Sequence, residues 1–89
     1  MAGKRALFKR CAGEIARECE QRSYDHWVAA DFPVVFERSF EGTEVQVEVE
    51  LLESTPAYVH LLVSVDDGGI WAYAPPSEST IIRKDAGEG

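Results

Sequence analysis

The sequence predicts an α+β fold, in which an N-terminal amphipathic helix packs on one face of a 4–5-stranded antiparallel meander sheet. Apolar residues recur at every third or fourth position over 4–22, which is typical of one face of a helix. After Pro33 they recur at every second position, as in strands with one buried face. Short turn sequences separate the alternating segments, so consecutive strands are expected to be neighbours in the sheet.

The predicted helix covers residues 4–22, and charged side chains line one of its sides. The apolar stripe on the other side consists of Phe8, Cys11, Ala12, Ile15 and Cys19. Such a stripe needs an apolar surface to lie on, and the sheet provides one. The helical rise places the two cysteines about 12 Å apart, too far for a disulfide, so we expect them to be reduced, buried and inert.

The connection over residues 23–33 has no clear period. It contains the aromatic residues Tyr24, His26, Trp27 and Phe32. We expect an ordered segment whose aromatic side chains tuck under the sheet. Pro33 suits the start of an edge strand.

The clearest signal in the chain is the strict alternation of apolar and polar residues over 44–51, which predicts a strand over 44–52 with one buried and one wet face. A partner strand is predicted over 34–41. Glycine first in a two-residue loop favours a type II′ turn at Gly42-Thr43, which would pair Arg38 with Val47. Arg38 would then lie on the apolar face, and it must sit near an edge, extend its head to water or find an acid.

Three further strands are predicted over 58–66, 70–74 and 80–84. The sequence Asp67-Gly68 favours a type I′ hairpin that pairs Val63 with Ala72 and Leu61 with Ala74. Residues 85–89 are expected to be a frayed polar tail.

Length and composition predict a single small domain over residues 1–89, with 45% apolar residues, enough for a folded core. No apolar run approaches the roughly 20 residues that span a bilayer. The basic N-terminal segment is not followed by an apolar stretch, so we expect no secretory signal and a cytoplasmic location.

The net charge of −7 is unevenly distributed along the chain. Residues 1–22 hold six basic and three acidic residues, whereas 23–89 hold three basic and thirteen acidic ones. An acidic body repels phosphate backbones, which argues against nucleic acid as a partner, and it would suit a basic protein. The basic cluster Lys4, Arg5, Lys9 and Arg10 could touch nucleic acid or an anionic membrane, but packing on the sheet explains the helix better.

The predicted pairing leaves one sheet face without a cover, because one helix covers one face only. This candidate interface consists of His60, Leu62, Trp71, Tyr73, Gln46, Glu48 and Glu50. Tryptophan and tyrosine are enriched in protein interfaces, so the face suits a protein partner or a second copy. Alternatively, residues 24–32 or 75–84 fold over it as a small second core.

The glycine patterns of a phosphate loop and of a dinucleotide fingerprint do not occur, and two cysteines cannot form a four-thiolate metal site. We therefore expect no catalytic residues, no cofactor and no metal. The predicted function is a non-enzymatic protein–protein interaction or regulatory module, with a homodimer as one form. Two alternatives stay open. One is a small acidic inhibitor or immunity-type protein that binds a basic partner. The other is a small enzyme that uses His60 with a sheet carboxylate; Asp25 beside His26 is a weaker candidate pair.

Overall fold

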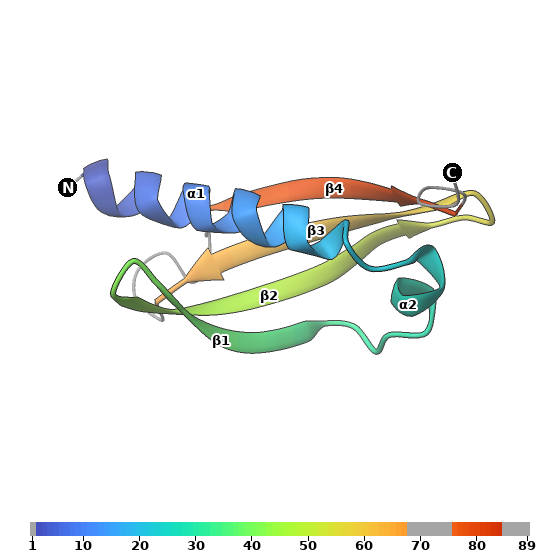
Figure 1. Cartoon of the computed structure of the whole chain (residues 1–89), viewed down its shortest axis with the longest axis horizontal. Coiled ribbons are helices and arrows are strands. Elements are labelled where there is room, and N and C mark those ends of the chain that lie inside the picture. Colours follow the sequence, from blue (N-terminus) through green and yellow to red (C-terminus); the bar gives the residue numbers. More distant parts are fainter. Residues whose placement is uncertain (1, 68–75, 85–89) are drawn as a thin grey trace.

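The computed structural model of the chain describes residues 2–67 and 76–84. The elements are the helices α1 (Ala2–Cys19) and α2 (Tyr24–Val28) and the strands β1 (Val34–Phe40), β2 (Thr43–Ser54), β3 (Tyr58–Asp66) and β4 (Ser77–Arg83). The strands form one antiparallel sheet in the order β1-β2-β3-β4, and α1 lies across one face of it (Figure 1). The predicted fold class, a helix on an antiparallel meander, is confirmed.

Helix α1 forms over the apolar stripe, as the sequence predicts. Its stripe residues Phe8, Cys11, Ala12, Ile15 and Cys19 are all buried. They share one core with Val45, Val47 and Val49 of β2, with the alternate residues of β3 and with Ile82 of β4. The helix ends at Cys19 rather than at residue 22, because the next turn tightens. The N–H groups of Gln21 and Arg22 donate to the carbonyls three residues earlier, at 3.0 and 3.1 Å.

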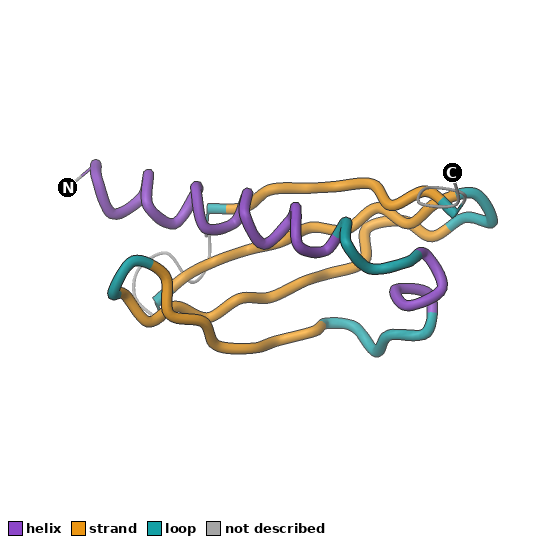
Figure 2. Tube along the Cα trace, viewed as in Figure 1, coloured by secondary structure: helices purple, strands orange, loops and turns teal. Residues whose placement is uncertain are grey.

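Helix α2 was not predicted, because five residues are too few to show a helical period. Ser23 caps it by accepting a hydrogen bond from the His26 N–H at 3.1 Å. The trace places α2 close to the end of α1 (Figure 2). Trp27 is buried, and its indole Nε1–H donates to the Cys19 carbonyl at 2.9 Å, which ties the two helices together. The expected tucking of aromatic side chains is thus confirmed for Trp27, and Tyr24 and Phe32 are half-buried against the same core.

The predicted turn between β1 and β2 is wrong by one residue. The loop residues are Glu41 and Gly42, whose φ angles of 52° and 83° are both positive, as in a type I′ turn. Arg38 therefore pairs with Val45 instead of Val47. This pairing shifts the register by two residues, so the side chains that face the helix stay the same.

Strands β2 and β3 pair along most of their length, and a bulge at Leu52 interrupts the pairing. Leu51 lies opposite Leu61, and Glu53 lies opposite His60, so Leu52 is the extra residue. The bulge breaks the alternation of buried and exposed residues, and both Leu51 and Leu52 are exposed.

The predicted pairing of residues 61–65 with 70–74 is wrong, because β4 occupies that edge of β3. Val63 lies opposite Glu78, and Leu61 lies opposite Thr80. The strand predicted at 80–84 exists but begins earlier, at Ser77, and ends at Arg83. The proposed strand 70–74 and tail 85–89 lie outside the described residues.

Candidate functional site

The face of the sheet turned away from the helices, here called the outer face, carries most of the predicted interface. It consists of the strand residues that alternate with the core valines and leucines. Glu50 lies opposite Leu62, and Glu48 lies opposite Ser64. His60, Leu62, Gln46, Glu48 and Glu50 thus share this face, as expected. Trp71 and Tyr73 lie outside the described residues.

The structure adds residues to the outer face that the sequence analysis did not place there. Ile81 of β4 lies opposite His60 and diagonally next to Leu62. Val35 of β1 lies opposite Glu48. Val35 and Ile81 are 51% and 47% exposed, so the face has a small accessible apolar component beside its carboxylates. Alternation over 34–41 already places Val35 on this side of the sheet, whereas the position of Ile81 depends on the pairing of β4 with β3.

Carboxylates dominate the charge of the outer face. Its described acidic residues are Glu37, Glu44, Glu48, Glu50, Glu53 and Asp66. In residues 2–67 and 76–84, Arg83 is the one Lys or Arg of the strands on this face. Glu53 accepts a hydrogen bond from the Tyr58 hydroxyl at 2.8 Å, and this bond raises the pKa of Tyr58. Within the same ranges, no cation forms an ion pair with Glu44, Glu48 or Glu50.

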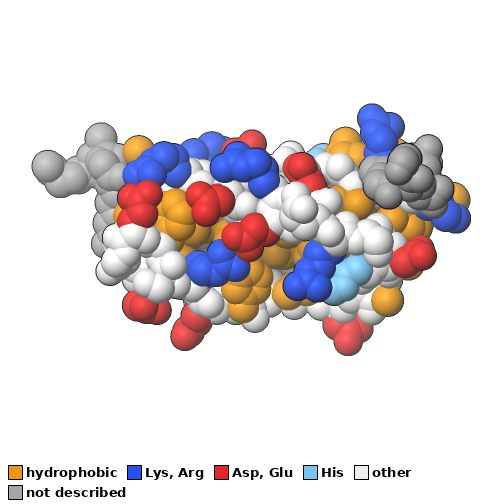
Figure 3. Space-filling model, in the orientation of Figure 1, with side chains coloured by type: hydrophobic (Ala, Val, Ile, Leu, Met, Phe, Trp, Pro, Cys, Tyr) orange, Lys and Arg blue, Asp and Glu red, His pale blue; other side chains and the backbone are white. Residues whose placement is uncertain are grey.

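The helix side differs, because several of its charged side chains form ion pairs. Ion pairs join α1 to the sheet and to the β1–β2 turn: Lys9 to Glu78 at 3.1 Å, Arg10 to Glu41 at 2.8 Å, and Glu18 to Arg38 at 2.9 Å. In the space-filling view of this side, basic and acidic side chains are interspersed (Figure 3). On the outer face, by contrast, the carboxylates of Glu44, Glu48 and Glu50 have no ion pair with a described residue.

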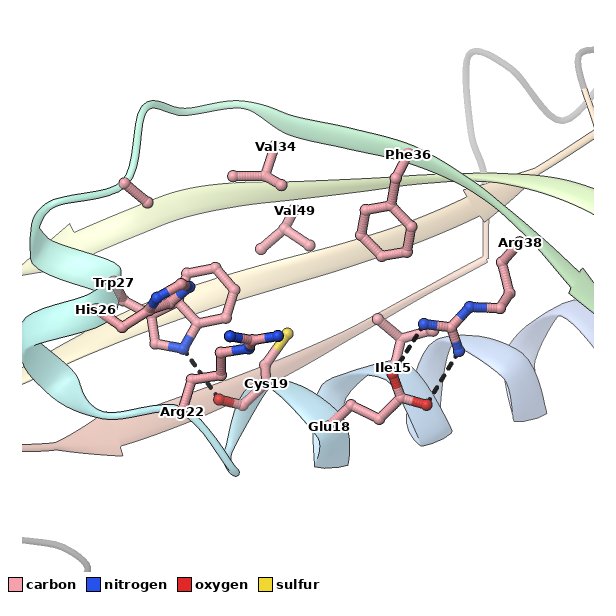
Figure 4. Close-up of a pocket in the computed structure, with 11 residues that line it drawn as sticks. Ile15, Glu18, Cys19, Arg22, His26, Trp27, Val34, Phe36, Arg38 and Val49 are labelled. Atoms are coloured by element: carbon pink, nitrogen blue, oxygen red, sulfur yellow. Dashed lines mark hydrogen bonds and ion pairs between the residues drawn. The ribbon is translucent and has the colours of Figure 1, made fainter.

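A cavity of about 420 Å³ opens on the helix side, between the end of α1, α2 and the first two strands (Figure 4). It exists because α1 lies over β3 and β4, which leaves the inner side of β1 partly covered. Its apolar lining is formed by Ile15, Cys19, Trp27, Ala30, Val34, Phe36 and Val49. Its polar rim consists of Glu18, Arg22, His26 and Arg38. We call this cavity the groove.

Arg38 lies at one end of the groove, and its guanidinium holds the Glu18 carboxylate. Two hydrogen bonds of 3.0 and 2.9 Å join them, and Arg38 also lies over the Phe36 ring at 5.6 Å. Arg38 was expected to lie near an edge of the sheet or to find an acid. Both are confirmed, because β1 is an edge strand and Glu18 is the acid. The hydrogen bond from Arg38 lowers the pKa of Glu18.

The Glu18–Arg38 ion pair should make a small contribution to the unfolding free energy, and this contribution depends on pH. Because the pKa of Glu18 is lowered in the folded chain, its contribution is present above the ordinary value of about 4.3 and is lost as the pH falls further. Both side chains are exposed by more than a third, so we expect Glu18→Gln to lower the unfolding free energy by no more than about 1 kcal/mol at pH 7. Urea denaturation at pH 7 and pH 3 measures the difference.

At pH 3 the Glu18→Gln variant and the parent should unfold alike. Glu14→Gln, one turn earlier on the exposed side of α1, is the matched control and should change little at either pH. An equal loss for Glu18→Gln at both values of pH would contradict an electrostatic origin.

The cysteines and histidines form no assembled catalytic group in the described parts of the chain. Cys11 and Cys19 are free and buried, as expected, and burial raises the pKa of Cys19 to about 11, which disfavours the reactive thiolate. The His26 ring meets Trp27 edge-on at 4.8 Å, without a hydrogen bond to Asp25. His60 is nearest in register to Glu53, and no hydrogen bond joins them. Across residues 2–67 and 76–84, no three potential ligands cluster around a metal position.

Neither of the described helices has the length and apolar character needed to cross a bilayer. Comparison with protein-family models, curated proteins and solved structures finds no match for this chain.

Proposed function

We propose that the chain is a non-enzymatic binding module whose outer face captures a basic protein. The observation that carries this proposal is the segregation of charge between the two sides of the sheet. On the helix side, ion pairs engage Lys9, Arg10 and Arg38, whereas Glu44, Glu48 and Glu50 have no cationic partner among the described residues.

The outer face combines apolar residues and carboxylates, a composition that supports binding of a basic protein. Leu62 and Ile81 are diagonal neighbours and provide apolar contact area, and Val35 lies beside Glu48. Glu48 and Glu50 of β2 lie between Val35 on one side and Leu62 and Ile81 on the other. A basic partner would be steered to these carboxylates before apolar contacts form.

Charge also decides between a basic partner and a second copy. Two outer faces brought together about a two-fold axis would place unpaired carboxylates against each other, and such juxtaposition costs free energy. The homodimer therefore needs another surface, and a different, basic protein is the better occupant of this one. An inhibitor or immunity-type protein that neutralises a basic target is one form of this proposal.

A cationic peptide of alternating lysine and leucine tests the proposal. We expect it to bind the ¹⁵N-labelled chain and to shift the amide signals of Glu48, Glu50 and Leu62 in NMR spectra. The dissociation constant should rise by about tenfold or more between 20 and 200 mM salt, because exposed charges are screened.

Two matched double variants distinguish binding at the outer face from a response to the net charge of the chain. Glu48→Lys with Glu50→Lys should abolish binding, whereas Glu14→Lys with Asp31→Lys makes the same change in net charge at exposed positions elsewhere and should reduce it much less. Equal weakening by both double variants would mean that the peptide responds to net charge alone, and it would refute the proposed surface. Sedimentation velocity at both salt concentrations should show a monomer.

A further inference from the structure

We propose that the groove binds a small organic anion with an apolar body, of the class of a medium-chain monocarboxylate. This inference uses the helix side of the molecule and does not depend on the outer face. The cavity of about 420 Å³ falls within the size range of small-molecule sites, which are mostly apolar with few polar groups.

The apolar part of the ligand has a surface to occupy between α1 and the first strands. Val34 and Phe36 of β1 face the core but are only half-buried, because α1 lies over β3 and β4 instead. Ile15 of α1 and Val49 of β2 form the deeper part of the lining and are buried. An alkyl or aryl body in this space would cover Val34 and Phe36 and remove apolar area from water.

The position of the ligand's carboxylate in the groove follows from which basic side chain has no partner. Arg38 is engaged twice by the Glu18 carboxylate, so this end of the groove is neutral. Arg22 and His26 lie at the other end, beside Trp27 (Figure 4). Among the described residues, the Arg22 guanidinium has no hydrogen-bond or ion-pair partner. A carboxylate there would gain charge-assisted hydrogen bonds from Arg22, and the His26 imidazole could add another.

The end wall near Arg22 is held in place before any ligand binds. The Trp27 indole donates to the Cys19 carbonyl at 2.9 Å, and its ring stacks on Phe32 with a centroid distance of 6.2 Å. Ser23 caps the helix that carries both Trp27 and His26. This preorganisation reduces the ordering cost of binding.

Octanoate, octanol and acetate are the probes, each titrated into the ¹⁵N-labelled full chain and followed by NMR. Octanoate should shift the indole N–H of Trp27 and the amides of Ala30 and Val34, and it should bind with a dissociation constant of about 1 mM or tighter. The second indole signal is assigned by Trp71→Phe. Octanol should bind at least several-fold more weakly than octanoate, and acetate should not reach saturation.

Arg22→Gln tests the anion end, because the side chain is exposed and its loss leaves the core intact. We expect this variant to weaken octanoate binding by about tenfold and to leave octanol binding unchanged. Arg17→Gln, an exposed arginine of α1 that does not line the groove, should bind octanoate like the parent.

Three results would overturn the inference: no shift at Trp27, Ala30 or Val34 with 10 mM octanoate, equal affinity for octanoate and octanol, or equal loss of octanoate binding in Arg22→Gln and Arg17→Gln. Saturation by acetate alone would show a surface cation without an apolar site and would overturn it as well.

Discussion

The Ile15→Asp variant should fail to fold. Ile15 lies about one turn before the end of α1, is only 2% exposed and belongs to the same core as the valines of the sheet. A carboxylate at this position has no cation to pair with in the core, and burying it costs several kcal/mol. Because small domains are stable by only about 5–15 kcal/mol, this cost removes most or all of the stability. Far-UV circular dichroism during urea denaturation should show no cooperative transition.

The matched control introduces the same residue two positions later on the exposed side of the helix. Arg17→Asp places a negative charge near the C-terminal end of α1, where the helix dipole opposes it by about 0.3–1 kcal/mol. This variant should keep its transition at a slightly lower urea concentration. If Ile15→Asp unfolds like the parent, α1 does not cover the sheet, and the groove beside it does not exist in solution.

The elements that could be predicted are those whose side chains repeat over a long stretch. The stripe from Phe8 to Cys19 and the alternation over 44–51 each extend over several periods, and the structure has a helix and a strand there. Helix α2 could not be found in this way. Its evidence was Ser23 in a capping position before a buried tryptophan, which is too local a signal to separate from an ordered loop.

Register was harder to predict than strand position, because more than one register buries the same side chains. The turns at Gly42-Thr43 and at Glu41-Gly42 differ by two residues in pairing, so both keep Phe36 and Arg38 on the helix side. Gly42 fits either turn, as the first loop residue of the predicted turn or as the second loop residue of the observed one. The choice depends on the positive φ of Glu41, which a non-glycine residue adopts only at some cost.

The groove could not be derived from periodicity, since it depends on the lateral position of α1. The stripe predicts that α1 covers the sheet, but it does not say which strands lie beneath. The charge of Arg38 was the one available clue, because a cation on the apolar side of β1 indicates that this side is reached by water. The charge asymmetry between the two sides likewise required the pairing of α1 cations with Glu41 and Glu78.

The Phe8→Ala variant should lose about 3–5 kcal/mol of unfolding free energy, the second largest effect expected in this chain. Phe8 is fully buried and is among the largest side chains of the core. Its removal leaves a cavity between α1 and the sheet that the neighbouring backbone cannot close. Urea denaturation monitored by circular dichroism measures the loss as a lower midpoint with an unchanged slope.

Leu62→Ala on the outer face is the informative comparison, because it distinguishes a binding surface from a second core. Leu62 is half-buried, and the cost of truncating it should be about 1 kcal/mol, in proportion to the apolar area that it covers. A free binding surface tolerates this change while losing affinity for the lysine–leucine peptide. If Leu62→Ala instead destabilises the chain as much as Phe8→Ala, the outer face is packed as a second core. The carboxylates around it would then have no accessible apolar centre, and the proposed capture of a basic protein would have to be abandoned.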